Sequence, residues 1–254
     1  RVRLLLVLIS HYKSIDMKTQ IILRKVHYAF SAFLCTACLV SCNDWLKPEP
    51  LSFYSPENTY VTKEGLEGAL VSCRAMIRPE FIGNNSYACT ELMTSDVAVA
   101  GNIVAQTLKN FEIQLKPGAY GDSQIGTFWS KGYSAIQKAN TIISRVQAAD
   151  EITENDKNTI LAEGYFHRSY WYYKLVNQFG DVPFIDKEVT TPKLDFYSHT
   201  RSSILKRLRE DMMFATRYLP ESAPHGAVSK AAGNHLLAKI CLACCDFDGA
   251  VAAT

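Results

Sequence analysis

Apolar residues recur every three to four positions along much of this chain, which is the spacing of an amphipathic helix. The pattern predicts helices over residues 62–77, 127–149, 154–178 and 198–220. Residues 229–254 predict a further helix and the beginning of another. Because that last helix begins so close to the final residue, we expect the chain to be the N-terminal part of a longer protein.

The helices follow one another in pairs of similar size, which is typical of stacked helical hairpins such as tetratricopeptide repeats (TPRs). The TPR consensus is met only loosely, since Trp129, Gly132 and Tyr133 have altered spacing. Between residues 79 and 126 the helical pattern gives way to Gly, Asn, Ser and isolated aromatic residues. Long irregular regions of this kind are usually functional. We therefore expect an all-α fold of TPR-like hairpins with long irregular loops.

Polar residues mark where two of these helices begin. Thr62 is a candidate N-cap for the helix over residues 62–77, and Thr153 and Asp156 form a plausible first turn for the helix that follows them. Small hydroxyl side chains suit these places because their oxygen accepts a hydrogen bond from an unpaired backbone N–H.

Charge is concentrated at the N-terminus. Residues 1–41 hold six Lys or Arg and one acid, which leaves 21 basic against 24 acidic residues in the remaining chain. No stripe of Lys or Arg follows a predicted helix, so we expect no nucleic-acid partner. With 48% hydrophobic and 20% charged residues, the body has ordinary globular composition.

The N-terminus has the layout of a targeting segment. We interpret residues 1–16 as an upstream translated segment and residues 17–41 as a signal peptide that starts at Met17; a single longer leader is the alternative. The basic segment is followed by an apolar run over residues 28–39, too short to span a bilayer. The run ends in "LVSC", which resembles the lipobox of bacterial lipoproteins, where the cysteine receives the lipid. The resemblance implies lipidation at Cys42. We then expect residues 42–61 to form a proline-containing tether between the lipid and the folded body.

Five cysteines follow the lipobox: Cys73, Cys89, Cys241, Cys244 and Cys245. A bridge between Cys73 and Cys89 is open, because nothing in the pattern requires it. His235 and the last three cysteines suggest a metal site, but His235 lies about 240° around the helix from Cys241. The surrounding Leu and Ala residues favour packing of these cysteines in a core, so we expect no metal there.

The chain carries no recognisable catalytic signature. It contains no Gly-x-Ser-x-Gly, Walker A, His-Glu-x-x-His or dinucleotide-binding fingerprint, and no pair of carboxylates is set in a motif. We therefore expect no enzyme activity and no cofactor.

Three blocks of the chain resemble the SusD/RagB family of outer-membrane lipoproteins from Bacteroidetes. The most specific is "AEGYFHRSYWYYKLVNQFGDVPFI", residues 162–185. Residues 128–143 and 228–250 resemble two further blocks, although Phe247 stands where the family has Trp or Tyr. The residues that match the first block in order are Arg168, Tyr170, Tyr172, Leu175, Phe179, Gly180, Asp181, Val182 and Pro183.

The physical chemistry of this block favours a scaffold role. Gly180 permits a left-handed residue at the helix end, and Pro183 cannot continue the helix. Asp181 can accept hydrogen bonds from freed backbone N–H groups. The aromatic run packs the hairpin, and catalysis by Asp181 or His167 has little support.

The resemblance implies a substrate-binding lipoprotein, anchored by its lipid in the outer membrane and facing the cell exterior. Such proteins cover a SusC-like TonB-dependent transporter and present oligosaccharide or peptide fragments for import. The family's ligand site draws on a loop that corresponds by position to "SDVAVAGNIVAQ", residues 95–106, within the irregular segment 87–126. The candidate contacts there are Tyr87, Asp96, Asn102, Gln106 and Tyr120. The alternative is a TPR-like scaffold lipoprotein that assembles proteins and has no ligand site of its own.

Overall fold

The computed structural model describes residues 59–81, 124–223 and 226–254, together with seven residues nearer the N-terminus: Thr19, Ile21, Ile22, Arg24, Lys25, His27 and Tyr28. The chain divides into two compact units, Arg1–Phe53 and Tyr54–Thr254. The described residues of the first unit are helical and exposed. All other described residues belong to the second unit, and most of them are helical, as predicted.

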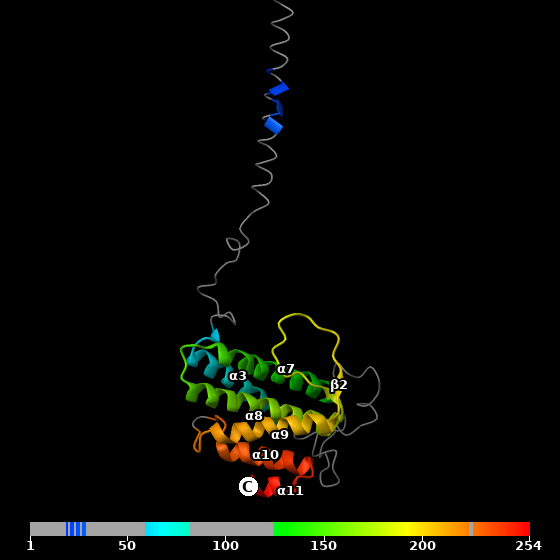
Figure 1. The fold of residues 1–254 in the computed structure, drawn as a ribbon. Helices are drawn as coiled ribbons and strands as arrows, with labels where there is room; N and C mark the ends of the chain where they lie inside the picture. The colour runs from blue at the N-terminus through cyan, green and yellow to red at the C-terminus, as the bar shows by residue number, and fades with distance from the viewer. Residues whose placement is uncertain are drawn as a thin grey trace, which may run out of the picture. The chain divides into compact units, whose positions relative to one another are not determined.

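The elements of the second unit, in chain order, are α3 (Lys63–Phe81), α7 (Gln124–Arg145), the 3-10 helix η1 (Val146–Ala148), α8 (Glu154–Phe179), β1 (Val182–Pro183), β2 (Ser198–His199), α9 (Arg201–Tyr218), α10 (Lys230–Ala243) and α11 (Phe247–Ala252). Successive helices from α7 to α11 pack on one another, and α3 packs against both α7 and α8. Figure 1 shows the result as a stack of helices that runs from α7 to α11. This is the predicted arrangement of TPR-like hairpins.

Helix α3 begins where the sequence predicts but ends later. Thr62 accepts a hydrogen bond from the backbone N–H of Gly65 at 3.2 Å, which confirms it as the N-cap. The expected end at residue 77 is wrong, because the helix continues through Pro79 to Phe81. A proline disfavours the helix interior, but here Glu80 ties the last turn to α8 through the ammonium of Lys174 at 2.7 Å.

Helix α8 has the predicted start and a sharper end than predicted. The Thr153 hydroxyl accepts a hydrogen bond from the backbone N–H of Asp156, as expected for an N-cap. At the other end Gly180 has φ 75° and ψ −120°. The positive φ was expected, but ψ lies outside the left-handed helical region and directs the chain into the extended strand β1. Only glycine adopts this conformation readily.

The connection after α8 confirms one expectation and corrects another. Asp181 accepts a hydrogen bond from an unpaired backbone N–H, that of Arg201, the first residue of α9, at 2.8 Å. The helix expected from residue 198 begins at Arg201, because β2 pairs antiparallel with β1 and Thr200 provides the N-cap. The connection therefore contains a two-stranded antiparallel ribbon with two residues in each strand.

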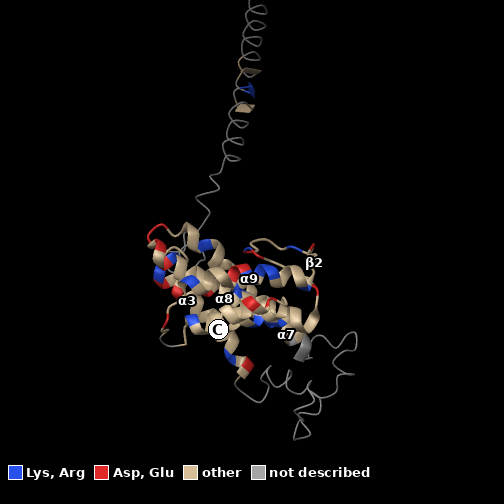
Figure 2. Cartoon of the chain, turned by 60° about the horizontal axis from the view of Figure 1, so that its bottom comes forward, with Lys and Arg blue, Asp and Glu red and all other residues tan. Residues whose placement is uncertain are grey.

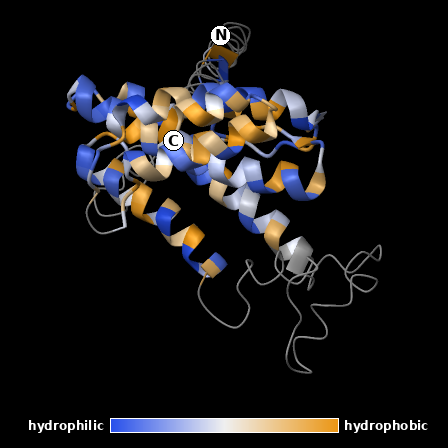
Figure 3. Ribbon diagram, turned by 90° about the horizontal axis from the view of Figure 1, so that it is seen from below, coloured by the Kyte–Doolittle hydropathy of each residue, from blue (hydrophilic) through white to orange (hydrophobic). Residues whose placement is uncertain are grey.

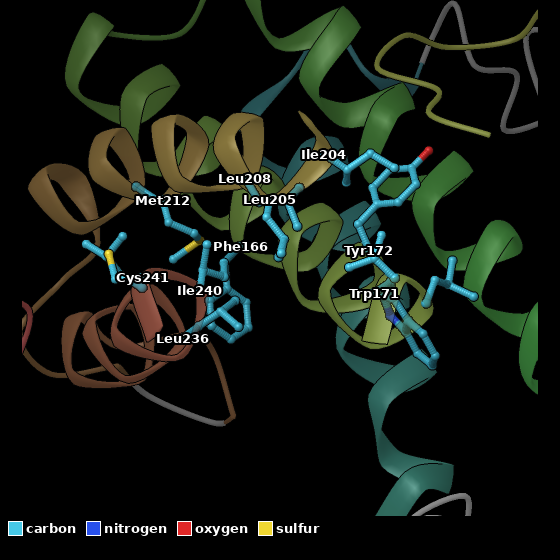
Figure 4. Packing of buried hydrophobic residues seen from close by; sticks show 14 of the residues in the cluster. Phe166, Trp171, Tyr172, Ile204, Leu205, Leu208, Met212, Leu236, Ile240 and Cys241 are labelled. Carbon is cyan, nitrogen blue, oxygen red and sulfur yellow. The ribbon is translucent and has the colours of Figure 1, made fainter. Parts of the chain in front are cut away.

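Helix α8 lies at the centre of the fold and is buried on nearly all sides. Its Leu161 joins a smaller core with α3 and α7, and its Trp171 and Tyr172 join a larger one. Figure 4 shows the larger core, where Phe166 of α8 points toward Leu236 and Ile240 of α10. Figure 3 shows apolar positions along the helices that pack together and hydrophilic ones on their outer turns.

Glycine permits a close contact between two helices of this core. A Cβ added to Gly132 of α7 would lie 3.1 Å from the Leu175 side chain of α8. The short spacing allows the two helices to approach each other along the face that carries the aromatic residues. Within the described ranges, no helix has the combination of length and hydropathy that a bilayer crossing requires.

Candidate ligand pocket between α3, α8 and α10

A pocket of about 700 Å³ opens where the end of α3 meets α8 and α10. This volume is in the range of small-molecule sites. The lining residues are Phe81 of α3; Phe166, Tyr170, Tyr173, Lys174, Asn177 and Gln178 of α8; and Ala232, His235, Leu236 and Lys239 of α10.

Helical spacing explains why these side chains meet. On α8, Phe166, Tyr170 and Tyr173 are separated by four and three residues and therefore share one face. On α10, His235 and Lys239 are four residues apart and share the face that looks onto α8. The two faces enclose the pocket because α10 packs against α8 at Phe166 and Leu236.

The floor and the rim of the pocket differ in character. Phe166 and Leu236 are buried and form an apolar floor. The rings of Phe166 and Tyr170 stack with centroids 6.3 Å apart. Toward solvent, Asn177, Gln178 and Lys239 are exposed. The pocket thus combines aromatic surface with polar groups that can donate hydrogen bonds.

One lysine of the pocket is already neutralised. Glu80 is fully buried, and its carboxylate lies 2.7 Å from the Lys174 ammonium. The hydroxyl of Tyr170 donates a hydrogen bond to the same carboxylate. Burying a carboxylate is costly unless it is paired, and these two contacts satisfy Glu80.

The other lysine is held differently. The Nζ atom of Lys239 lies 5.9 Å from the centre of the Tyr173 ring, within cation–π range. In the described part of the chain, Lys239 makes no ion pair. Of the described residues that line the pocket, none is Asp or Glu.

Tyr170 of the Phe-Gly-Asp-Val-Pro block lines the pocket, whereas Tyr172, Phe179 and Pro183 of the same block hold the connection to α9 and the contact with α7. The Tyr172 hydroxyl accepts from the backbone N–H of Ile185 at 2.6 Å. The carbonyl of Pro183 accepts from the Tyr133 hydroxyl at 2.8 Å. The Phe179 ring meets Trp129 edge-on at 5.0 Å. These contacts fix the path of the chain between α8 and α9.

Arg168, which also belongs to the block, is the centre of a buried polar network. It bonds the carboxylate of Asp211 on α9, the Asn140 side chain at 3.3 Å and the Asp186 carbonyl at 3.0 Å. Asn140 in turn donates to the Ile185 carbonyl at 2.7 Å. The network joins α7, α8, α9 and the connection, so its role is structural.

A second buried network joins α3 to α8. Arg74 holds the Glu163 carboxylate with two bonds of 2.6 and 2.9 Å, and His167 lies 3.4 Å from the same group. Burial alone would raise the pKa of Glu163, but the hydrogen bonds with His167 and Arg74 outweigh it and lower that pKa. His167 is buried and does not face the pocket, so nothing in its position suggests catalysis.

Core packing, expected for the last three cysteines, is confirmed for Cys241 and wrong for Cys245. Cys73 and Cys241 are buried free thiols, whereas Cys244 is half-buried and Cys245 exposed. Cys89, the other half of the bridge left open in the sequence, lies outside the described residues. Across the described ranges, no group of three or more His, Cys, Asp or Glu side chains is arranged to hold a metal ion. His235 faces the pocket instead of the cysteines.

Several predicted site residues lie outside the described residues. These are the lipidation site Cys42 and the five loop residues Tyr87, Asp96, Asn102, Gln106 and Tyr120. The sequence analysis missed the pocket, because it interpreted the aromatic run of α8 as hairpin packing alone. The available signal was the spacing of Tyr170, Tyr173 and Asn177, which puts polar and aromatic groups on one face.

Comparison with known proteins identifies the family. A family model described as "starch-binding associating with outer membrane", SusD-like, matches residues 66–242. SusD-like protein P2 of Formosa agariphila is 29% identical over 233 residues, which are 90% of this chain and 45% of that protein. SusD-like protein P25 of the same organism is 25% identical, over 88% of this chain and 43% of that protein. The chain therefore spans somewhat less than half the length of these relatives.

Solved structures show the same fold. A laminarin-binding SusD-like protein superposes with a TM-score of 0.63 at 23% identity, over 74% of this chain and 41% of its own. Surface glycan-binding protein A of Bacteroides uniformis has a TM-score of 0.63 at 18% identity, over 76% of this chain and 45% of its own. With the family match covering most of the chain and the helical stack shared, the chain belongs to the SusD-like family.

Proposed function

We propose that the protein captures glycan fragments and delivers them to a SusC-like TonB-dependent transporter in the outer membrane. The observation that supports this most directly is the pocket between α3, α8 and α10, in a chain of the SusD-like family. The names of two structural relatives mention laminarin and surface glycans, which makes carbohydrate the first ligand class to test.

The pocket suits a sugar ring for physical reasons. The apolar face of a sugar packs against aromatic rings, and Phe81, Tyr170 and Tyr173 line the pocket. Sugar hydroxyls need donors and acceptors, which the amides of Asn177 and Gln178 supply. A peptide is the alternative ligand, because amide groups also pair with peptide backbones. The five loop residues between α3 and α7 are proposed as further contacts.

Delivery needs a surface for the transporter, and the connection between α8 and α9 offers apolar side chains. Leu194 and Tyr197 are 99% and 79% exposed. Large apolar residues left in solvent are frequent at protein interfaces. The same observation supports the alternative function, a scaffold that binds proteins without a glycan ligand.

Two tyrosine variants separate these functions. We expect Tyr173→Ala in the full-length protein to lose glycan binding and retain the transporter, because Tyr173 lines the pocket. We expect Tyr197→Ala to do the reverse. Calorimetric titration with oligosaccharides and peptides, and co-purification with the transporter, measure the two properties. Glycan binding that survives Tyr173→Ala would contradict the pocket assignment; absence of any ligand with the transporter retained would favour the scaffold.

We further propose that Cys42 carries the lipid anchor and that the protein faces the cell exterior. We expect cells fed a labelled fatty acid to label the wild-type protein and not Cys42→Ala. Protease added to intact cells should then digest the body of the labelled protein. An unlabelled wild type would contradict lipidation, and a labelled protein resistant to protease would contradict the exterior orientation.

A further inference from the structure

We propose that the glycan bound in the pocket carries a negative charge, as a carboxylate or sulfate group, and that Lys239 is its main partner. This inference rests on the proposed function, because it takes the pocket as the glycan site. It adds the class of sugar, which the comparisons with relatives do not give.

The first step is the charge balance of the pocket wall. Among the described residues that line it, two are lysines and none is a carboxylate. Lys174 is matched by the buried Glu80 at 2.7 Å, so its charge is compensated within the protein. Lys239 has no carboxylate within ion-pair distance among the described residues. One positive charge at the rim is therefore left for a ligand.

The second step is the position of that charge. Lys239 lies over the ring of Tyr173, with Nζ 5.9 Å from the ring centre. A sugar that packs against the same aromatic wall would bring its substituents close to this ammonium. His235 is four residues earlier on the same face of α10 and also lines the pocket. Both side chains are exposed, so binding an anion requires no displacement of a buried group.

The third step is the mismatch with a neutral sugar. A neutral sugar has many hydroxyl hydrogens, and carboxylates are the strongest acceptors for them. Among the described lining residues, the Tyr170 and Tyr173 hydroxyls, the Asn177 and Gln178 amides and the His235 ring can each donate or accept, whereas the two lysines can only donate and no carboxylate is present to accept. An excess of donors and an uncompensated cation complement an acidic or sulfated sugar better than a neutral one. Figure 2 shows that elsewhere on the described helices acidic and basic residues are interspersed.

The test uses pairs of oligosaccharides that differ only in charge. The probes are a galacturonate oligosaccharide with its methyl ester, and a sulfated galactan oligosaccharide with its desulfated form. Each is titrated into the full-length protein at low and high sodium chloride. We expect at least one charged member to bind about tenfold more tightly than its neutral partner. The preference should shrink at high salt because screening weakens contacts between exposed charges. Which pair shows it distinguishes carboxylate from sulfate.

Two lysine variants assign the effect. Lys239→Gln should remove most of the charge preference, and affinity for the neutral members should stay within about twofold of wild type. Lys206→Gln, at an exposed lysine of α9 that does not line the pocket, should retain the preference. Because Lys239 is exposed, we expect its variant to fold, and a thermal melt checks this. A Lys239→Glu variant should bind the charged probes more weakly still.

The outcomes separate the two proposals. Equal affinity for charged and neutral members would overturn the charge inference and leave glycan binding intact. A charge preference that persists in Lys239→Gln would overturn the role of Lys239. Binding of none of these oligosaccharides, nor of laminarin oligosaccharides, would overturn glycan binding in the pocket and the charge inference with it.

Discussion

The guanidinium of Arg168 on α8 and the carboxylate of Asp211 on α9 are 2.5 Å apart, and their side chains are only 1% and 4% exposed. The pair joins two helices that belong to different TPR-like hairpins. Burial raises the pKa of Asp211 although the Arg168 guanidinium opposes this shift. The cost of removing the carboxylate from water is therefore large, and the ion pair offsets only part of it.

We expect Arg168→Met to lower the free energy of unfolding by about 3–5 kcal/mol, because it leaves Asp211 buried without its main partner. The double variant Arg168→Met/Asp211→Leu should recover much of this loss, since neither charge of this pair then remains buried between α8 and α9. Denaturant unfolding of wild type, both single variants and the double variant measures the coupling. If the double variant were no more stable than Arg168→Met, the loss of stability in Arg168→Met could not be explained by the unpaired carboxylate of Asp211.

The sequence predicted half of this relationship. Arg168 was identified as part of the motif, but Asp211, 43 residues later, belongs to a helix whose pattern shows only its own apolar face. Contacts within one helix turn, such as the caps at Thr62 and Thr153, follow from short spacings and were predicted. Contacts between helices depend on how the helices stack, which spacing does not determine.

The same distinction explains the other differences. Helix α3 passes Pro79 because Glu80 bonds with α8, and α9 starts late because the chain before it pairs with β1. The pocket is formed by residues of three helices, so no single stretch of the sequence predicts it. The stack itself was predictable, because amphipathic helices in pairs have few other ways to bury their apolar faces.

The glycine that ends α8 provides a test of backbone conformation alone. A Cβ at Gly180 would meet no atom within 4 Å, yet its φ of 75° and ψ of −120° suit only glycine. We expect Gly180→Ala to lower the free energy of unfolding by about 1–3 kcal/mol. Chemical denaturation measures the change.

Gly68 provides the matched control for that prediction. It lies in the interior of α3, and a Cβ there would also meet no atom within 4 Å. Because alanine favours a helix interior more than glycine does, Gly68→Ala should raise the free energy of unfolding by up to about 1 kcal/mol. Equal effects of the two substitutions would contradict the conformational role of Gly180.

The network between α3 and α8 predicts how stability changes with pH. The pKa of Glu163 is below its usual value of 4.5 in the folded protein, so between these values the unfolded chain binds more protons. The stabilisation from its ionised form is present above about pH 4.5 and is lost as the pH falls through the lower, folded-state pKa. We expect the free energy of unfolding to decrease over this acidic window.

Removing the carboxylate isolates this contribution. Glu163→Gln should be less stable than wild type at neutral pH, because it weakens the bonds with Arg74, and the difference should narrow as the pH falls below 4.5. Glu151→Gln, at an exposed residue before α8, is the control and should leave the pH dependence unchanged. Urea unfolding at a series of pH values measures all three proteins. A constant difference between Glu163→Gln and wild type at all pH values would contradict the assignment.

The free thiols report on which helices open in the folded protein. Burial raises the pKa of Cys73 to about 12, and since the thiolate is the reactive form, this thiol should resist alkylation. Cys241 is equally buried, whereas Cys245 is exposed at the end of α10.

We expect iodoacetamide to modify Cys245 first and to reach Cys73 and Cys241 only when the protein unfolds. Mass spectrometry of peptides over time measures each rate. If Cys73 reacted as fast as Cys245, α3 would have to separate readily from α7 and α8, and the buried Arg74–Glu163 contact could not persist in solution.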